Sequence, residues 1–188
     1  MKKRESREIT RMVITLFVIT LVCSALLGLV NAVTEDRIAE NRDAAQQAAM
    51  RAVLPGASGF RDVTDRLPED IKAQNRVTGI YQAPGLGYVV TVTPRGFGGD
   101  ISLTVGVDNA GTITGAAITD HSETPGLGAR ADDAGFLSQF VGKTAGVTAV
   151  KGAAAGNQIS AITGATVTSR AVTAGALAAV KAVQAAQA

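Results

Sequence analysis

The segment YVVTVTPRGFGGDISLTVGVDNAGTITGAAIT, residues 88–119, decides the fold class of this chain. Three stretches in it, residues 88–93, 101–107 and 112–119, are rich in β-branched residues, and the first two alternate apolar with polar or small side chains. Such patterns are typical of strands with one buried face. The intervening Pro-Arg-Gly and Asp-Asn-Ala-Gly sequences are turn formers, and turns this short join antiparallel strands. We therefore predict an antiparallel meander.

Helices are predicted on either side of these strands. Residues 35–54 are rich in Ala, Gln, Glu and Arg, and Pro55-Gly56 ends that helix. After the strands, residues 131–141 carry apolar side chains on one side, residues 147–150 suit a short strand, and residues 168–184 form an Ala-rich helix. The predicted fold class is therefore α+β, an antiparallel sheet with packed helices.

An uncharged run of 23 residues, Met12–Thr34, precedes this domain. About 20 apolar residues in a helix span the ~30 Å hydrocarbon core of a bilayer. A signal peptide is the alternative, but its apolar region is shorter and a small-x-small cleavage site should follow it. The sequence offers no clean site of that kind, so we predict one uncleaved transmembrane helix.

The charges around this helix predict its orientation. Residues 1–11 hold five basic and two acidic residues, whereas the ten residues after the run hold only two basic ones. Under the positive-inside rule the N-terminus then lies in the cytoplasm. We predict a single-pass protein of the cell (inner or cytoplasmic) membrane with a cytoplasmic basic segment at 1–11, a transmembrane helix at 12–34, a juxtamembrane helix at 35–56 and an extracytoplasmic domain at 57–188.

Several functional classes are excluded by composition. Beyond the basic start the chain is nearly neutral, which leaves no basic footprint for nucleic acid. The one histidine, His121, and the one cysteine, Cys23 in the membrane run, cannot build a disulfide or a His/Cys zinc or haem site. Asp132-Asp133 suits the first turn of a helix better than a metal site, and no P-loop is present. We expect no metal and no catalytic residue.

A hydroxyl-rich segment, Ser160–Arg170 (SAITGATVTSR), leads into the last predicted helix. Its small residues let the backbone approach a ligand closely, and a helix start offers free N–H groups and a positive dipole end. These are the elements of an anion or phosphate site. Thr and Ser at a helix start also serve as ordinary N-caps. The residues alone leave both interpretations open.

Two motifs resemble those of the membrane-anchored FMN-binding domain family. Thr163-Gly164-Ala165-Thr166 matches its (Ser/Thr)-Gly-Ala-Thr flavinylation motif, whose last Thr bears FMN through a phosphoester bond. His121-x-Glu123-Thr124-Pro125-Gly126-Leu127-Gly128 matches a second motif, which borders the flavin in that family. The resemblance covers the whole chain. One departure is Ser160, six residues before Thr166, where the family usually has an Asp that would serve the flavin transferase.

The resemblance implies a covalent FMN on Thr166, with its phosphate held by the N–H groups that follow. Around the phosphate it implies Thr163, Gly164, Ala165, Thr168 and Ser169, and around the flavin ring Glu123, Thr124, Gly126, Leu127 and Gly128. Glu123 and Thr124 would either hydrogen-bond the flavin edge or shape the loop, and both roles stay open. His121 is expected to be a hydrogen-bonded strand end.

Within the family the chain is most similar to the G subunits of Rnf-type complexes. This similarity implies an electron carrier that is not an enzyme by itself, within a complex that passes electrons between ferredoxin and NAD and exports Na⁺ or H⁺. The implied partners are other membrane and redox subunits and a flavin transferase. An alternative is a relative of the C subunits of sodium-pumping NADH:quinone reductases, although those chains are typically longer than 188 residues.

A second alternative is a non-redox, membrane-anchored binding module of the pilin-like kind. A basic start, an apolar helix and an exported α+β body describe such a protein too. A pilin should show Gly-Phe-Thr-Leu-Ile-Glu at the helix start, whereas residues 11–16 read Arg-Met-Val-Ile-Thr-Leu. A yellow protein that fluoresces under ultraviolet light in a denaturing gel would favour the flavoprotein.

Overall fold

The computed structural model of the chain describes residues 2–187, with side chains described from Thr10 onward except at Asp36. Backbone contacts divide the chain into two units, one ending at Ala44 and one running from Ala45 to the C-terminus. Five basic residues support the predicted orientation. The side chains of four of them are not among those described, namely Lys2, Lys3, Arg4 and Arg7.

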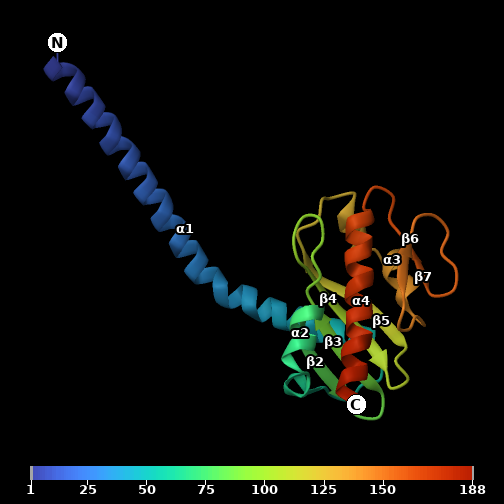
Figure 1. Cartoon of the computed structure of the whole chain (residues 1–188). Helices are drawn as coiled ribbons and strands as arrows, with labels where there is room; N and C mark the ends of the chain where they lie inside the picture. The colour runs from blue at the N-terminus through green and yellow to red at the C-terminus, as the bar shows by residue number, and fades with distance from the viewer. Residues whose placement is uncertain (1, 188) are drawn as a thin grey trace. The chain divides into compact units, whose positions relative to one another are not determined.

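The first unit is formed by helix α1 (Lys2–Val53), which continues into the second unit (Figure 1). The predicted apolar run lies entirely within α1, and its large side chains are exposed. The hydroxyls of Thr15 and Thr34 donate to the carbonyls four residues earlier, at 2.8 Å each, so these polar groups are satisfied inside the helix. In the described part of the chain, α1 is the one helix long and apolar enough to cross a membrane.

The second unit is built on a five-stranded antiparallel sheet whose strands follow one another in chain order (Figure 1). The strands are β1 (Arg61–Asp62), β2 (Val77–Ala83), β3 (Gly87–Val92), β4 (Ile101–Asp108) and β5 (Ile113–His121). Strands β3, β4 and β5 correspond to the three predicted stretches, so the predicted meander and the α+β class are confirmed. Strands β1 and β2 were not predicted.

Two tight turns set the register of this sheet. Between β2 and β3, the Leu86 N–H donates to the Ala83 carbonyl at 3.1 Å and Gly85 has φ +81°, as a Pro-Gly type II turn requires. Between β4 and β5, the Asp108 carboxylate accepts the N–H groups of Ala110 and Thr112 at 2.9 and 2.8 Å. Both turns use residues that the sequence marks as turn formers.

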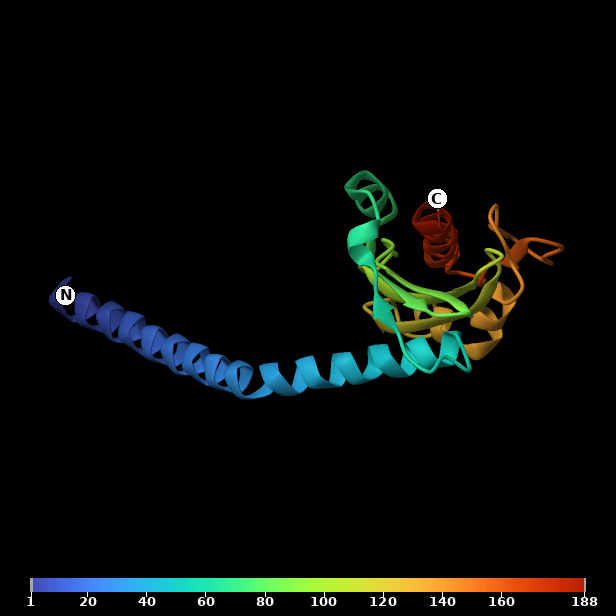
Figure 2. The same ribbon diagram turned by 90° about the horizontal axis from the view of Figure 1, so that it is seen from below.

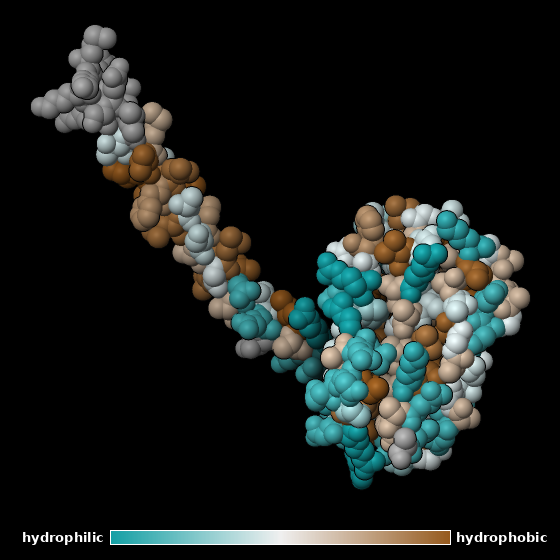
Figure 3. All heavy atoms as spheres, in the orientation of Figure 1, coloured by the Kyte–Doolittle hydropathy of each residue, from teal (hydrophilic) through white to brown (hydrophobic). Residues whose placement is uncertain are grey.

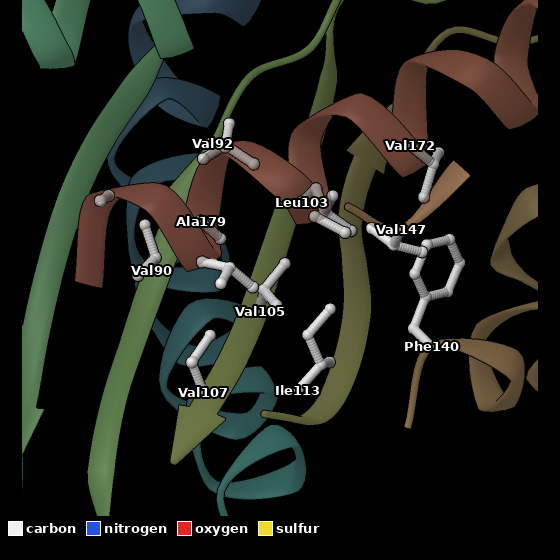
Figure 4. Packing of buried hydrophobic residues seen from close by; sticks show 14 of the residues in the cluster. Val90, Val92, Leu103, Val105, Val107, Ile113, Phe140, Val147, Val172 and Ala179 are labelled. Atoms are coloured by element: carbon white, nitrogen blue, oxygen red, sulfur yellow. The ribbon is translucent and has the colours of Figure 1, made fainter. Parts of the chain in front are cut away.

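The main core lies between the sheet and helix α4 (Thr166–Gln187), which covers one face of the sheet (Figure 2). Alternate residues of the strands point toward this helix, and Figure 4 shows Val90, Val92, Leu103, Val105 and Val107 packed beneath it. Helix and sheet approach closely at Gly175, where a Cβ would lie 2.9 Å from the Pro94 ring. The Ala-rich sequence of α4 permits this close packing.

The opposite face of the sheet carries the last turns of α1 (Figure 2). Met50, Val53 and Leu54 pack there against Ala83 and Val89 in a second, smaller core. The Thr114 hydroxyl donates to the Val53 carbonyl at 2.6 Å. A Cβ on Gly115 would lie 2.9 Å from the Val53 Cα, so a glycine is needed where the helix end meets the sheet.

Short elements fill the connections. They are the 3₁₀ turn η1 (Thr64–Arg66), helix α2 (Glu69–Asn75), the 3₁₀ turn η2 (Gly128–Asp132), helix α3 (Ala134–Leu137), the 3₁₀ turn η3 (Ser138–Phe140) and the parallel strand pair β6 (Thr148–Val150) and β7 (Gln158–Ser160). The helix predicted over 131–141 is wrong as one element, because Asp133 has an extended backbone with ψ 135° and interrupts it. The predicted strand at 147–150 is confirmed as β6, and its pairing with β7 was not predicted.

Candidate functional site

The two motifs singled out in the sequence meet at the end of the sheet where α4 begins (Figure 1). The Thr168 hydroxyl, in the first turn of α4, donates to Glu123 Oε2 at 2.7 Å across 45 residues of sequence. A Cβ built on Gly164 would lie 3.1 Å from Leu127 Cδ2. The structure therefore brings residues 121–128 and residues 163–169 into direct contact.

The start of α4 leaves backbone donors without a protein acceptor. The helix begins at Thr166, and the first helical bond runs from the Ser169 N–H to the Ala165 carbonyl at 3.0 Å. Among the described residues, no acceptor is recorded for the N–H groups of Thr166, Val167 and Thr168. Ala165, immediately before the helix, has no side-chain oxygen that could cap them. This geometry favours the anion-site interpretation over the ordinary N-cap.

A rigid turn presents Thr166. The Ala165 N–H donates to the Ile162 carbonyl at 3.0 Å, and Gly164 has φ +83°, which a side chain rarely adopts. The buried Ser169 hydroxyl donates to the Ala165 carbonyl at 2.9 Å and accepts the Ile162 N–H at 3.0 Å. Ser169 therefore links the turn to the helix, and in this conformation its hydroxyl donates its hydrogen bond to a protein acceptor.

Glu123 is buried, with 6% of its surface exposed, and uses both carboxylate oxygens within the protein. Its Oε1 accepts the N–H groups of Phe97 and Gly98 at 2.8 and 3.0 Å, while Oε2 accepts from Thr168. Its own N–H donates to His121 Nδ1 at 3.3 Å, so His121 is a hydrogen-bonded end of β5, as expected. Of the two roles left open for Glu123, these contacts match the shaping of the loop.

The loop after Glu123 forms a second Pro-Gly turn. The Leu127 N–H donates to the carbonyl of Thr124 at 3.2 Å, and Gly126 has φ +76° with open space around it. The turn leaves Thr124 and Leu127 exposed, with Leu127 46% exposed. A Cβ on Gly128 would meet the Glu123 carboxylate and would lie 2.9 Å from Thr168 Oγ1. Gly128 thus permits the contact between the two motifs.

A third segment, the hairpin Gly96–Gly99 between β3 and β4, contacts these motifs through Glu123 and was not predicted from the sequence. The Gly96 N–H donates to the Gly99 carbonyl at 2.8 Å, and Phe97 at the tip is 73% exposed. Its sequence, Gly-Phe-Gly-Gly, completes no nucleotide-binding motif. The sequence did contain one signal that could have indicated it, an aromatic residue among glycines between two predicted strands.

One carboxyl group near the site has a perturbed pKa. Partial burial raises the pKa of Asp132, at the end of η2, and the neighbouring Asp133 raises it further, while His121 lowers it. The Arg130 side chain lies 3.8 Å from the Asp133 carboxylate in an exposed pair. These carboxyl groups follow the Leu127 turn in the chain, and among the described residues no hydrogen bond joins them to Thr166.

Comparison with known proteins identifies the family. The model of the FMN-binding domain matches residues 96–181, and that of the RnfG N-terminal region matches residues 1–53. The G subunit of the ion-translocating oxidoreductase complex of Methanosarcina acetivorans is 36% identical over 174 residues, covering 89% of this chain and 90% of that protein. The chain belongs to this RnfG family. The FMN-binding match takes in all three segments of the site, and the N-terminal match ends where α1 ends.

Other members of the RnfG family are similar over most of their length. The G subunit of the Na⁺-translocating ferredoxin:NAD⁺ oxidoreductase complex of Acetobacterium woodii is 36% identical, covering 85% of this chain and 84% of that protein. The proton-translocating counterpart of Clostridium ljungdahlii is 31% identical, covering 93% and 91%. The crystal structure of the C subunit of the Na⁺-translocating NADH-quinone reductase from Parabacteroides distasonis has the same fold, with a TM-score of 0.56 at 20% identity, covering 79% of this chain and 94% of that one.

Proposed function

We propose that this chain carries FMN covalently on Thr166 and serves as an electron-carrier subunit of a membrane ferredoxin:NAD oxidoreductase complex coupled to Na⁺ or H⁺ translocation. Membership of the RnfG family and the FMN-binding domain support this function. The main structural support is the start of α4. There Thr166 follows a fixed turn, and the backbone N–H groups of Thr166, Val167 and Thr168 have no protein acceptor among the described residues and could bind an anion. The relatives named above are described with either ion, so the family leaves the coupling ion open.

The residues present fit a flavin mononucleotide. Among the described residues, the Thr168 and Ser169 hydroxyls donate to protein acceptors, whereas no hydrogen bond is recorded for the half-buried Thr166 hydroxyl. It is therefore the hydroxyl of this helix start that is free to carry a phosphate, beside the N–H groups and dipole that favour an anion. Val167 and Leu127, 54% and 46% exposed, offer apolar surface for a flat ring.

When bound, FMN supplies the redox chemistry. The chain's own residues hold it and control its surroundings. The N–H groups of the first turn of α4 would hold the phosphate, the Gly164 turn would orient Thr166, and the exposed Leu127 side chain would offer apolar surface to the ring. The proposed role is that of an electron carrier within the complex rather than of an enzyme that acts alone.

The proposed setting is the cytoplasmic membrane, with the N-terminus inside and the domain outside. The charge asymmetry around residues 12–34 supports this orientation. The proposed partners are the other membrane and redox subunits and a flavin transferase that esterifies Thr166. A role in an NADH-quinone reductase is less well supported, because similarity to the C subunit of that complex rests on the fold at 20% identity, while the RnfG relatives reach 36%.

The test is intact-protein mass spectrometry of variants made in a host with an active flavin transferase. Thr166→Ala should abolish the mass increment of one FMN and the in-gel fluorescence, and Thr166→Ser should retain part of both. Thr163→Ala is the comparison, because Thr163 is an exposed hydroxyl three residues away in the same motif, and this variant should weaken occupancy without removing the covalent bond. Thr166→Ala protein with full covalent flavin would refute the site, and an unmodified wild-type chain would refute the function.

A further inference from the structure

Phe97 is the most exposed of the described large apolar side chains in the globular unit. It is 73% exposed, against 54% for Val141 and Val167 and 46% for Leu127. An aromatic side chain buries a large area when it binds a partner, so one that is this exposed at a binding site suggests that a ligand or partner covers it.

The hairpin that carries Phe97 is held firmly at its base. The Ile101 N–H donates to the Pro94 carbonyl at 3.0 Å, and Arg95 pairs with Asp100 in an isolated antiparallel bridge. The Asp100 carboxylate also contacts the Arg76 guanidinium at 2.7 Å. Phe97 is therefore exposed from a fixed position rather than from a loose loop.

Glu123 ties the tip of this hairpin to the start of α4. One carboxylate accepts the Phe97 and Gly98 N–H groups on one oxygen and the Thr168 hydroxyl on the other. The segments fit closely, because a Cβ on Gly96 would meet the Glu123 carboxylate and one on Gly98 would meet the Ser122 carbonyl. The place of Phe97 relative to the first turn of α4 is thus set through a single side chain.

The three segments that meet at this helix start each carry an exposed apolar side chain, namely Phe97, Leu127 and Val167. In Figure 3 hydrophobic atoms gather at the end of the globular unit where these segments lie. Val167 adjoins Thr166, and Leu127 lies against Gly164 of the same motif. Apolar side chains around Thr166 suit a bound flat aromatic ring, against which Phe97 would stack or pack edge to face.

We propose that the Gly96–Gly99 hairpin is a third wall of the flavin site, in which Phe97 contacts the ring of the FMN on Thr166 and Glu123 is the positioning residue that holds this wall in place. This inference rests on the proposed function. It gives Glu123 a role through the hairpin rather than through a hydrogen bond to the flavin. It also explains why the buried Glu123 carboxylate accepts hydrogen bonds from two backbone amides 25 and 26 residues away.

The test places a quencher at the tip of the hairpin in the full-length, flavinylated protein. An indole quenches an excited flavin by electron transfer only at close contact, and this chain contains no Trp. Phe97→Trp should therefore shorten the flavin fluorescence lifetime severalfold. Leu86→Trp is the control, since Leu86 is an exposed residue in the turn at the opposite end of β3. It should leave the lifetime unchanged.

The role of Glu123 is tested in the Phe97→Trp background. Glu123→Gln keeps an acceptor for both hairpin amides and should keep most of the quenching, whereas Glu123→Ala should restore a long lifetime. Gly98→Ala, which pushes the hairpin off the Ser122 carbonyl while leaving Glu123 intact, should do the same if the Glu123→Ala protein does not fold. A merely stabilising Glu123 would lower the unfolding temperature without lengthening the lifetime.

The outcomes separate the two proposals. Intact mass first establishes that FMN is attached to each variant, and its absence from the wild-type chain counts against the proposed function. With FMN attached, a flavin fluorescence lifetime that Phe97→Trp leaves unchanged would overturn the proposal that the hairpin is a third wall of the flavin site. Phe97 would then be assigned to contact with a protein partner. Quenching that survives both Glu123→Ala and Gly98→Ala would overturn the positioning role of Glu123.

Discussion

The contact between Thr168 and Glu123 gives the sharpest test of how the site is held together. Thr168→Val keeps the shape and β-branching of the side chain and removes one donor, which lies 2.7 Å from Glu123 Oε2. Both residues are buried, at 1% and 6% exposure, so water does not replace the lost bond. A hydrogen bond to a charged group contributes about 1.5–3 kcal/mol, and a stranded buried acceptor costs about 1–3 kcal/mol.

Because Glu123 keeps its two backbone donors, we expect a loss of about 2 kcal/mol in the free energy of unfolding, or about 4–8 °C in unfolding temperature for a domain of this size. The control is Thr173→Val on the same helix. The Thr173 hydroxyl is also buried, at 4% exposure, and donates at 2.7 Å to the Ser169 carbonyl within α4. Such bonds to the preceding turn add little to helix stability, so its loss should cost less than about 1 kcal/mol.

The assay is urea unfolding of the unmodified full-length protein in detergent, followed by tyrosine fluorescence. Both tyrosines, Tyr81 and Tyr88, lie in β2 and β3 and report on the globular unit alone. If Thr168→Val is no more destabilising than Thr173→Val, the Glu123 contact contributes nothing measurable. That result would refute the inference that this carboxylate joins the two motifs.

Three further expectations concern the neighbouring loops and the membrane. Gly128→Ala should lower the unfolding temperature in differential scanning fluorimetry more than Gly126→Ala, because the new Cβ at residue 128 meets the buried Glu123 carboxylate. Gly126 has open space around it, so its substitution costs only the strain of a positive φ, about 1 kcal/mol. The reverse order of unfolding temperatures would contradict this packing. Ser160→Asp should raise the flavinylated fraction when transferase is limiting, despite losing the hydroxyl bond to the Gly152 carbonyl at 2.6 Å, and Ser160→Ala, which loses that bond alone, should not; equal fractions across a transferase titration would remove the carboxylate argument. A reporter fused after Ala188 should be active only outside the cytoplasm, and cytoplasmic activity would reverse the orientation.

The strands that could be predicted are those with a regular pattern. In β4, Ile101, Leu103, Val105 and Val107 all face α4, and this alternation is visible in the sequence. Strand β2 was missed, since its pairing with β3 shifts register near Gly79 and its pattern is irregular. Asp133 breaks the helix predicted over 131–141 through its backbone angle, which no periodicity reveals.

The candidate site was predictable only where side chains carry a motif. The residues around Thr166 and the Glu123–Gly128 loop could be named from the sequence by resemblance, and the structure places the two segments in contact. The hairpin at Phe97 could not, because it joins the site through backbone N–H groups. Any residue type except proline can supply such a donor, so the bond leaves no signature in the sequence.

The docking of the last turns of α1 on the sheet has a practical consequence for anyone who wants this domain without its membrane anchor. Cutting the chain at residue 57 would strip Met50, Val53 and Leu54 from the sheet and uncover Ala83 and Val89, an apolar patch prone to aggregation. A truncated, water-soluble fragment should instead begin near Ala45, where the compact unit starts.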